Sequence, residues 1–225
     1  MERHFQKELE SLKTSLVKMG SVVEENFDRS IRSVIERNST LADQVIETDK
    51  RVDALEIEID NDIVDLLALQ QPVASDLRFI LAALKINNDL ERIGDHAVNI
   101  AQSAQNLSSI TNARILDEIP QMAAISRTML KEAIDSFVLQ NPSMAHKVLT
   151  SDDQIDDLNR LVTKRVIDVI KSSTETVECE MELSRISRNL ERIADLTTNI
   201  AEEVIFHTEA RVVKHHAEEE KKSDA

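Results

Sequence analysis

The chain has 225 residues and a formal net charge of −15, and apolar residues make up 41 % of it while aromatic residues make up only 2 %. Nucleic acids and anionic lipid surfaces bind basic proteins, so this charge argues against both as partners and is compatible with binding of cations or basic surfaces. Only two glycines and three prolines are present, too few for the turns that sheets need, so the composition predicts long helices around an aliphatic core.

Apolar residues recur three and four positions apart along most of the chain, which is the spacing of one helical face. The first such stripe begins near Phe5 and ends near Arg37, where the cap-forming residues Asn38–Thr40 follow. A second stripe, through Leu67, stops before Pro72, because proline cannot continue a helix. The pattern predicts six helices, at about 5–37, 41–67, 75–107, 116–139, 144–170 and 177–213.

The six predicted helices divide into two groups of three because the chain repeats itself. The segment DLERIGDHAVNIA, which ends at Ala101, recurs as NLERIADLTTNIA, which ends at Ala201, and NSTLADQVIETDKRVDAL aligns with NPSMAHKVLTSDDQIDDL. Repetition of this kind indicates a duplication, and short connections favour antiparallel neighbours. We therefore predict an all-α fold of two tandem, similar, antiparallel three-helix bundles, over residues 1–109 and 110–213, with a charged, disordered tail over 214–225.

Each half of the repeat carries acidic pairs one helical turn apart. Residues four apart lie on the same helix face, about 5–6 Å between Cβ atoms, where like charges repel. If the two helices that carry the pairs lie side by side, four carboxylates converge and need cations to offset the repulsion. Oxygen ligands favour hard ions, so iron, manganese or magnesium is expected. The predicted metal ligands are Asp49 and Asp53, Glu91 and Asp95, Asp152 and Asp156, and Glu191 and Asp195.

The competing interpretation is that the acidic pairs belong to solvated helix faces. Charged residues make up 31 % of the chain, and Arg192 could neutralise Glu191 across helices. The pairs nevertheless recur at equivalent places in both halves, and neighbours such as Asn99 and Asn199 recur with them. This recurrence favours a metal platform in each half over an unrelated set of surface acids.

Other chemistry is not indicated by the sequence. His96 follows Asp95, but its counterpart is Leu196, so we interpret His96 as a flanking residue rather than an essential ligand or base. We find no Gly-rich phosphate loop and no nucleophile–base pair, so an enzyme is not predicted. The single cysteine, Cys179, is expected to be a buried thiol. One cysteine, no apolar signal segment and no long apolar run together predict a cytoplasmic protein without a membrane span.

The segments LLALQQPVASDLRFILAALKINNDLERIGDHAVNIA and LERIADLTTNIAEEVIF are similar to the repeated signature of the PhoU family of phosphate-regulatory proteins, and the resemblance covers about residues 5–206. It implies two similar three-helix bundles, often dimeric, with multinuclear metal clusters at the acidic pairs, iron in some members. It also implies a negative regulator of phosphate uptake and of the phosphate-starvation response. The implied partners are the ATPase subunit of the phosphate ABC transporter, a phosphate-sensor histidine kinase and a second copy of the chain.

Two departures from the family pattern concern the predicted metal sites. Members often have a histidine at the position of Leu196 and an acidic residue at that of Gln102, so the two sites are expected to differ in metal content or affinity. Two other functions stay open at this point. One is a metal-dependent phosphohydrolase built on the same carboxylates, and the other is a plain helical scaffold whose acidic pairs are solvated.

Overall fold

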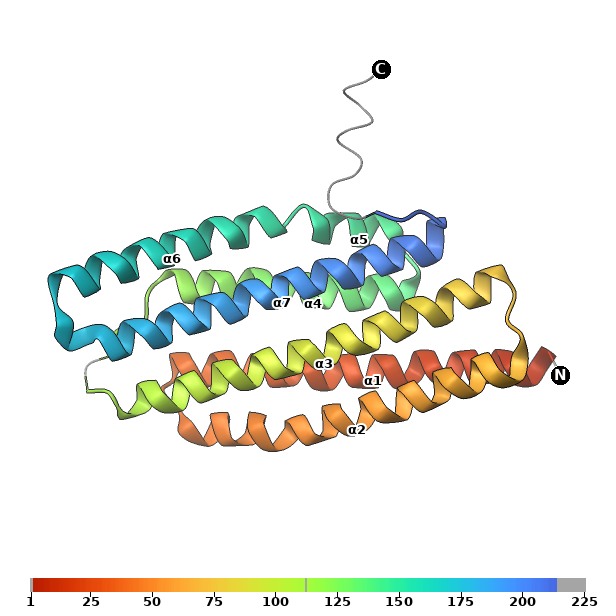
Figure 1. Cartoon of the computed structure of the whole chain (residues 1–225), viewed down its shortest axis with the longest axis horizontal. Helices are drawn as coiled ribbons and strands as arrows, with labels where there is room; N and C mark the ends of the chain where they lie inside the picture. Colours follow the sequence, from red (N-terminus) through yellow and green to blue (C-terminus); the bar gives the residue numbers. More distant parts are fainter. Residues whose placement is uncertain (1, 112, 214–225) are drawn as a thin grey trace, which may run out of the picture.

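The computed structural model describes residues 2–111 and 113–213, and within these residues the chain forms helices and short connections without strands. The helices lie side by side along the long axis of the molecule (Figure 1). They are α1 (Glu2–Ile35), α2 (Ser39–Gln70), α3 (Ala74–Ser109), α4 (Glu118–Leu139), α5 (Pro142–Leu149), α6 (Asp152–Ser172), the 3₁₀ helix η1 (Thr174–Thr176) and α7 (Val177–Glu209). The tail predicted over 214–225 lies outside the described residues.

The duplication is visible in how the second helix of each half begins. Asn38 Oδ1 accepts hydrogen bonds from the backbone N–H groups of Thr40 (3.1 Å) and Leu41 (3.3 Å) at the start of α2. Asn141 Oδ1 accepts the equivalent bonds from residues 143 (3.1 Å) and 144 (3.4 Å) at the start of α5. Both asparagines therefore satisfy backbone donors that a helix N-terminus leaves unpaired.

One predicted helix is interrupted in the structure. The prediction of a single helix over 144–170 was wrong, because α5 ends at Leu149 and α6 begins at Asp152. Thr150 Oγ1 and Ser151 Oγ both donate to the carbonyl oxygen of Lys147, at 2.8 and 3.2 Å. Hydroxyl groups that bond nearby carbonyls in this way compete with the backbone ladder. The last helix also ends earlier than predicted, at Glu209.

The two bundles meet along a seam between α3 and α7, and α1 also packs against α4 (Figure 1). At the seam, Lys85 Nζ lies 2.7 Å from Glu203 Oε1, and Asn106 Nδ2 lies 3.1 Å from Glu182 Oε1. Residue numbers rise along α3 while they fall along α7, so the two helices are antiparallel. Because α3 and α7 are the equivalent third helices of the two halves, each half contributes the same element of the repeat to the seam.

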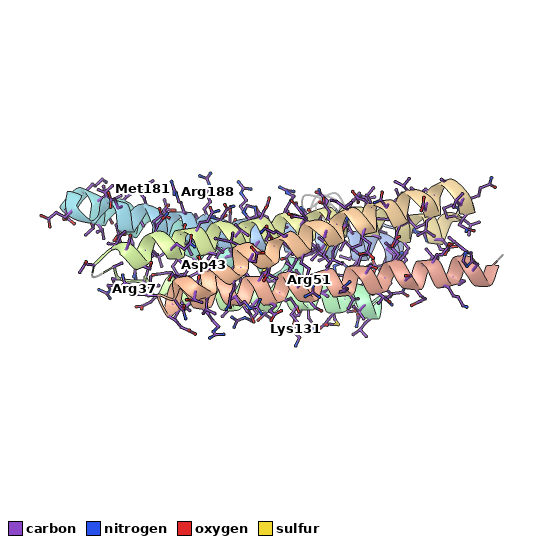
Figure 2. The ribbon with its side chains drawn as sticks, turned by 90° about the horizontal axis from the view of Figure 1, so that it is seen from below. Arg37, Asp43, Arg51, Lys131, Met181 and Arg188 are labelled. Carbon is purple, nitrogen blue, oxygen red and sulfur yellow. The ribbon has the colours of Figure 1, made fainter. Side chains whose placement is uncertain are left out.

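The core is continuous through both bundles and is mainly aliphatic, as the composition predicts. Between α1 and α4, Gly20 permits a close approach, because a Cβ atom there would lie 3.1 Å from Ile134 Cδ1. Charged side chains cover the outside of the elongated molecule, with Lys131 and Arg188 at opposite edges in Figure 2.

Candidate functional site

The first acidic site lies between α2 and α3. Asp49 on α2 packs against α3 at Gly94, where a Cβ atom would lie only 3.1 Å from Asp49 Oδ1. The glycine therefore lets this carboxylate approach the backbone of α3, one residue away from Asp95. Asp49 and Glu91 are partly buried, whereas Asp53 and Asp95 are exposed. The four predicted ligands of the first half thus come together on two adjacent helices.

The electrostatics of this first site show that its carboxylates repel one another across the two helices. Burial raises the pKa of Asp49 to about 6, and the negative charges of Asp53 and Asp95 add to the shift. Burial likewise raises the pKa of Glu91 to about 7, with repulsion from Asp95 and then Glu56 as the next causes. We find no ion pair between a described residue and any of the four predicted ligands here. The site therefore holds a concentration of negative charge that no ion pair from the described part of the chain offsets.

The second acidic site lies between α6 and α7. Asp152 is the first residue of α6, directly after the interruption at residues 150–151, and Asp156 follows one turn later. Burial raises the pKa of Asp152 to about 6, and repulsion from Asp195 and Asp156 adds to the shift. Asp152 Oδ1 and Glu191 Oε2 are both buried without a hydrogen-bond partner. The structure thus also gathers the four predicted ligands of the second half.

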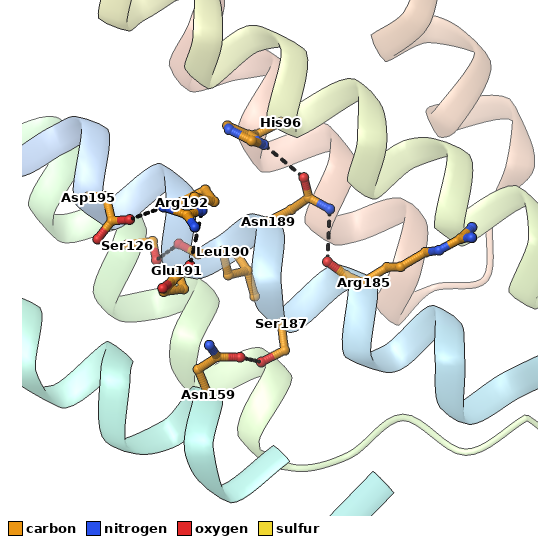
Figure 3. A network of polar contacts seen from close by, with 10 residues as sticks. All are labelled: His96, Ser126, Asn159, Arg185, Ser187, Asn189, Leu190, Glu191, Arg192 and Asp195. Atoms are coloured by element: carbon orange, nitrogen blue, oxygen red, sulfur yellow. Dashed lines mark hydrogen bonds and ion pairs between the residues drawn. The ribbon is translucent and has the colours of Figure 1, made fainter. Parts of the chain in front are cut away.

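Arginines distinguish the second site from the first: Arg160 Nη1 lies 3.9 Å from Asp156 Oδ2, and Arg192 contacts two of the other acids (Figure 3). Arg192 Nη1 lies 3.1 Å from Asp195 Oδ2, and Arg192 Nε lies 3.6 Å from Glu191 Oε2. Burial raises the pKa of both carboxyl groups, and the positive charge of Arg192 opposes this shift in each. Arg192 therefore forms ion pairs with acids of its own helix, whereas the competing interpretation expected it to neutralise Glu191 across helices.

The equivalent arginine of the first half points to a different acid. Arg92 Nη1 lies 3.7 Å from Asp89 Oδ1. The counterpart of Asp89 in the second half is the neutral Asn189, which lies 2.8 Å from His96 Nδ1 (Figure 3). A competing carboxylate on α3 therefore engages Arg92, whereas Arg192 has no such competitor and pairs with the acidic site.

The donor set of each site suits a hard cation in type, because it consists of carboxylate oxygens. Two observations fit such a cation: the buried Asp152 Oδ1, which has no hydrogen-bond partner, and the space that Gly94 leaves beside Asp49. Within the part of the chain that the structure describes, we find no three His, Cys, Asp or Glu side chains already arranged to hold a metal ion. The metal ligands named from the sequence stay a prediction.

The whole chain resembles known proteins in sequence and in fold. The family model described as the PhoU domain matches residues 16–104 and again residues 119–204. The chain belongs to the PhoU family. The PhoU homologue of Aquifex aeolicus, a phosphate-specific transport system accessory protein, is 35 % identical over 96 % of this chain and 97 % of its own length. The corresponding homologue of Clostridium acetobutylicum is 33 % identical over 90 % of this chain and 93 % of its own length.

Solved PhoU structures share the architecture. The crystal structure of PhoU from Pseudomonas aeruginosa superimposes with a TM-score of 0.90 at 32 % identity, covering 92 % of this chain and all of that one. The phosphate transport system regulatory protein PhoU from Streptococcus pneumoniae gives a TM-score of 0.87 at 27 % identity, covering 94 % of this chain. The predicted all-α fold of two tandem, similar bundles is thereby confirmed.

Two other predictions from the sequence of this PhoU chain concern its cysteine and the absence of a membrane span. Cys179 is buried, and burial raises the pKa of its thiol, as expected for an unreactive cysteine. No helix among the described residues is both long and apolar enough to cross a membrane. Sequence reasoning did not identify Glu56, which repels Glu91 from the next turn of α2. Glu56 lies three residues after Asp53, a spacing that also places two side chains on one helix face. A search limited to four-residue spacing overlooks it.

Proposed function

We propose that this protein is a cytoplasmic negative regulator of phosphate uptake and of the phosphate-starvation response, acting by binding other proteins. The observation that carries the proposal is the match to both copies of the PhoU domain over nearly the whole chain. The relatives named as accessory proteins of phosphate-specific transport support it. The proposed partners are the ATPase subunit of the phosphate ABC transporter, a phosphate-sensor histidine kinase and, in a homodimer, a second copy of the chain.

The proposal includes binding of metal ions by the acidic pairs. In the first half, Asp49, Asp53, Glu91 and Asp95 would hold iron, manganese or magnesium, and the aligned acids of α6 and α7 would do so in the second. A bound cation would supply positive charge that offsets the mutual repulsion of the carboxylates. The carboxylates themselves would tie α2 to α3, and α6 to α7, through a shared ligand set. Occupied sites would thus stiffen the outward helices that a partner protein meets.

Regulation by binding needs a difference in affinity for two states of the partner. If this protein binds the inactive state of the transporter ATPase more tightly than the active state, it shifts the population toward inactivity. The long helices present extended, rigid faces suited to such docking. Phosphate status would then act on the complex by changing that difference in affinity.

The test is recovery of the partners from cells. A tagged copy of the chain is isolated from phosphate-replete cells, and bound proteins are identified by mass spectrometry. We expect the transporter ATPase subunit and the sensor kinase to be enriched over an untagged control. Deletion of the gene should also raise expression of a phosphate-starvation reporter in replete medium. Absence of both partners together with an unchanged reporter would contradict the proposal.

A catalytic role is a separate outcome that the same purified protein can reveal. We expect metal-loaded protein to hydrolyse phosphate esters no faster than the buffer blank. Hydrolysis that is lost in the Asp95→Ala variant would instead favour a metal-dependent phosphohydrolase.

A further inference from the structure

A strongly acidic cavity lies beside the seam, between α2, α3 and α7. None of the predicted metal ligands lines it, and Glu56 in its lining also repels Glu91 of the first acidic site. Its volume is about 540 Å³, which is within the range of small-molecule sites. One lysine, Lys85, is the single cationic side chain in its lining. The carboxylates that line it are Glu56, Asp60, Asp89, Glu202 and Glu203.

Glu203 is a buried carboxylate in this lining, and one of its two oxygens has no hydrogen-bond partner. Its exposed fraction is 6 %. Its Oε1 accepts a hydrogen bond from Lys85 Nζ at 2.7 Å, while its Oε2 is buried without any hydrogen-bond partner. A buried carboxylate oxygen without a donor is costly, so Glu203 keeps unused capacity to accept a hydrogen bond beside the cavity.

Hydrogen bonds hold two of the other acids, Asp60 and Asp89, in place. Asn87 Nδ2 donates to Asp60 Oδ1 at 2.9 Å and to the backbone carbonyl of Glu56 at 3.1 Å. Asp89 has an exposed fraction of 8 % and interacts with Asn199 of α7. Three helices thus present fixed carboxylates to one space.

The second half lacks this acidity at the equivalent positions. The register of the repeat pairs Ile59 with Val162 and Leu90 with Leu190, and all four side chains are buried. In that register the five cavity acids correspond to Asn159, Thr163, Asn189, Gln102 and Ser103, which are all neutral. Lys85 and Asn88 correspond to Arg185 and Arg188. The acidic cavity therefore lies on one side of the seam, without an acidic counterpart at the equivalent positions on the other side, and is not a by-product of the duplication.

We propose that this cavity binds an organic cation, namely an ammonium or guanidinium group on an alkyl stem. A bare metal ion fits less well, because no three acidic side chains converge here among the described residues and the cavity is many times larger than an ion. Lys85 already shows how an ammonium is received, between Glu203 and the ring of Phe206, whose centroid is 5.5 Å from Nζ. Leu84, exposed over 39 % of its surface, offers an apolar wall for an alkyl stem.

Calorimetric titration of the full-length protein tests the proposal. The probes are spermidine, a capped Gly-Arg-Gly peptide and magnesium chloride, each in 0.1 M salt. The cavity variant Asp89→Asn/Glu203→Gln removes two buried acids, and Asp89→Asn copies the side chain at position 189. The matched control Glu10→Gln/Glu58→Gln removes the same charge from exposed positions outside the cavity. We expect one-to-one binding of spermidine or of the peptide, at least tenfold weaker in the cavity variant and within twofold of wild type in the control.

A second cavity variant, Glu56→Gln/Asp60→Asn, gives the same readout if thermal unfolding shows that the first variant does not fold. Preference for spermidine identifies a free polyamine as the ligand, and preference for the peptide identifies a basic side chain of a partner protein. Equal losses in cavity and control variants, no binding of either organic probe, or tighter cavity-dependent binding of magnesium would each overturn the proposal. None of these results depends on recovery of the transport partners.

Discussion

The two acidic sites occupy equivalent places in the duplication, yet they balance their charge differently. In the first half, the pKa of Glu91 is raised to about 7. No lysine, arginine or histidine among the described residues forms an ion pair with the four acids. In the second half, Arg192 pairs with both Glu191 and Asp195, and Arg160 pairs with Asp156. The same four carboxylate positions are thus left uncompensated in one bundle and partly compensated in the other.

The difference teaches that residues outside the site contribute to its charge balance. Arg92 and Arg192 are equivalent, but Asp89 engages the first while the neutral Asn189 leaves the second available. Asp89 also lines the acidic cavity, so one substitution between the halves affects two places at once. We expect the first site to depend more strongly on an external cation than the second.

The largest expected effect is on the free energy of unfolding, and it tests whether the cores of the two halves are equivalent. Ile93 and Ile193 occupy matching core positions and both have an exposed fraction of 0 %. Truncation of either to alanine should lower the free energy of unfolding by about 2–5 kcal/mol, because each leaves a cavity in a packed core. Urea unfolding of Ile93→Ala and Ile193→Ala measures both. A substantial loss in one variant and none in the other would show that the cores are not equivalent.

The pH dependence of stability should be larger for the first half than for the second. In the second half, the pKa of Asp152 is raised to about 6, and Arg192 opposes the rise in pKa of the two site acids on α7. The folded-state pKa values of Asp49, about 6, and Glu91, about 7, lie above the ordinary values of 3.8 and 4.5. The folded state therefore binds more protons than the unfolded state between about pH 4 and 7, so stability falls as pH rises through that window. Because both groups are partly exposed, we expect a loss of only about 1 kcal/mol after solvent screening.

Thermal unfolding in a chelating buffer at pH 5 and pH 8 measures this loss. Glu91→Gln should flatten the pH dependence more than the matched variant Glu191→Gln, and added manganese should flatten it in wild type. Stability that rises from pH 5 to pH 8 in the chelator would have the wrong sign for this account.

The smallest expected effect on stability comes from Arg192, one of the arginines that distinguish the sites. Arg192→Gln removes partly exposed ion pairs, which contribute at most about 1 kcal/mol. The same change leaves Glu191 and Asp195 without their cation, so affinity for manganese at the second site should rise several-fold. Arg92→Gln is the control, because Arg92 pairs with Asp89. Calorimetric titration with manganese compares the two, and equal effects would remove the distinction between the halves.

Most of the fold could be predicted from the sequence because helical periodicity and cap residues are local signals. The interruption of the predicted helix 144–170 escaped, since the buried apolar spacing continues through Val148, Ile155 and Val162 across the break. The signal for it was present in Thr150 and Ser151, whose hydroxyls bond the preceding turn. Which helices of the two bundles meet at the seam depends on packing between distant segments, and no local pattern encodes it.

The acidic pairs could be predicted for the same reason, because a spacing of four places two side chains on one helix face. Their charge balance could not, since the partner of Arg192 depends on the residue at position 189 and on how α7 packs against α3. The cavity acids come from three helices and share no linear motif. Only the structure brings Glu56, Asp89 and Glu203 to one space.

The metal content of purified protein tests the central claim most directly. Elemental analysis is applied to wild type and to a variant in which Glu91, Asp95, Glu191 and Asp195 are all replaced by alanine, both purified without chelators and checked for folding by circular dichroism. We predict that wild type retains iron, manganese or magnesium and that the variant loses it. The same negligible metal content in both would contradict the account, and the gathered carboxylates would then be surface charge alone.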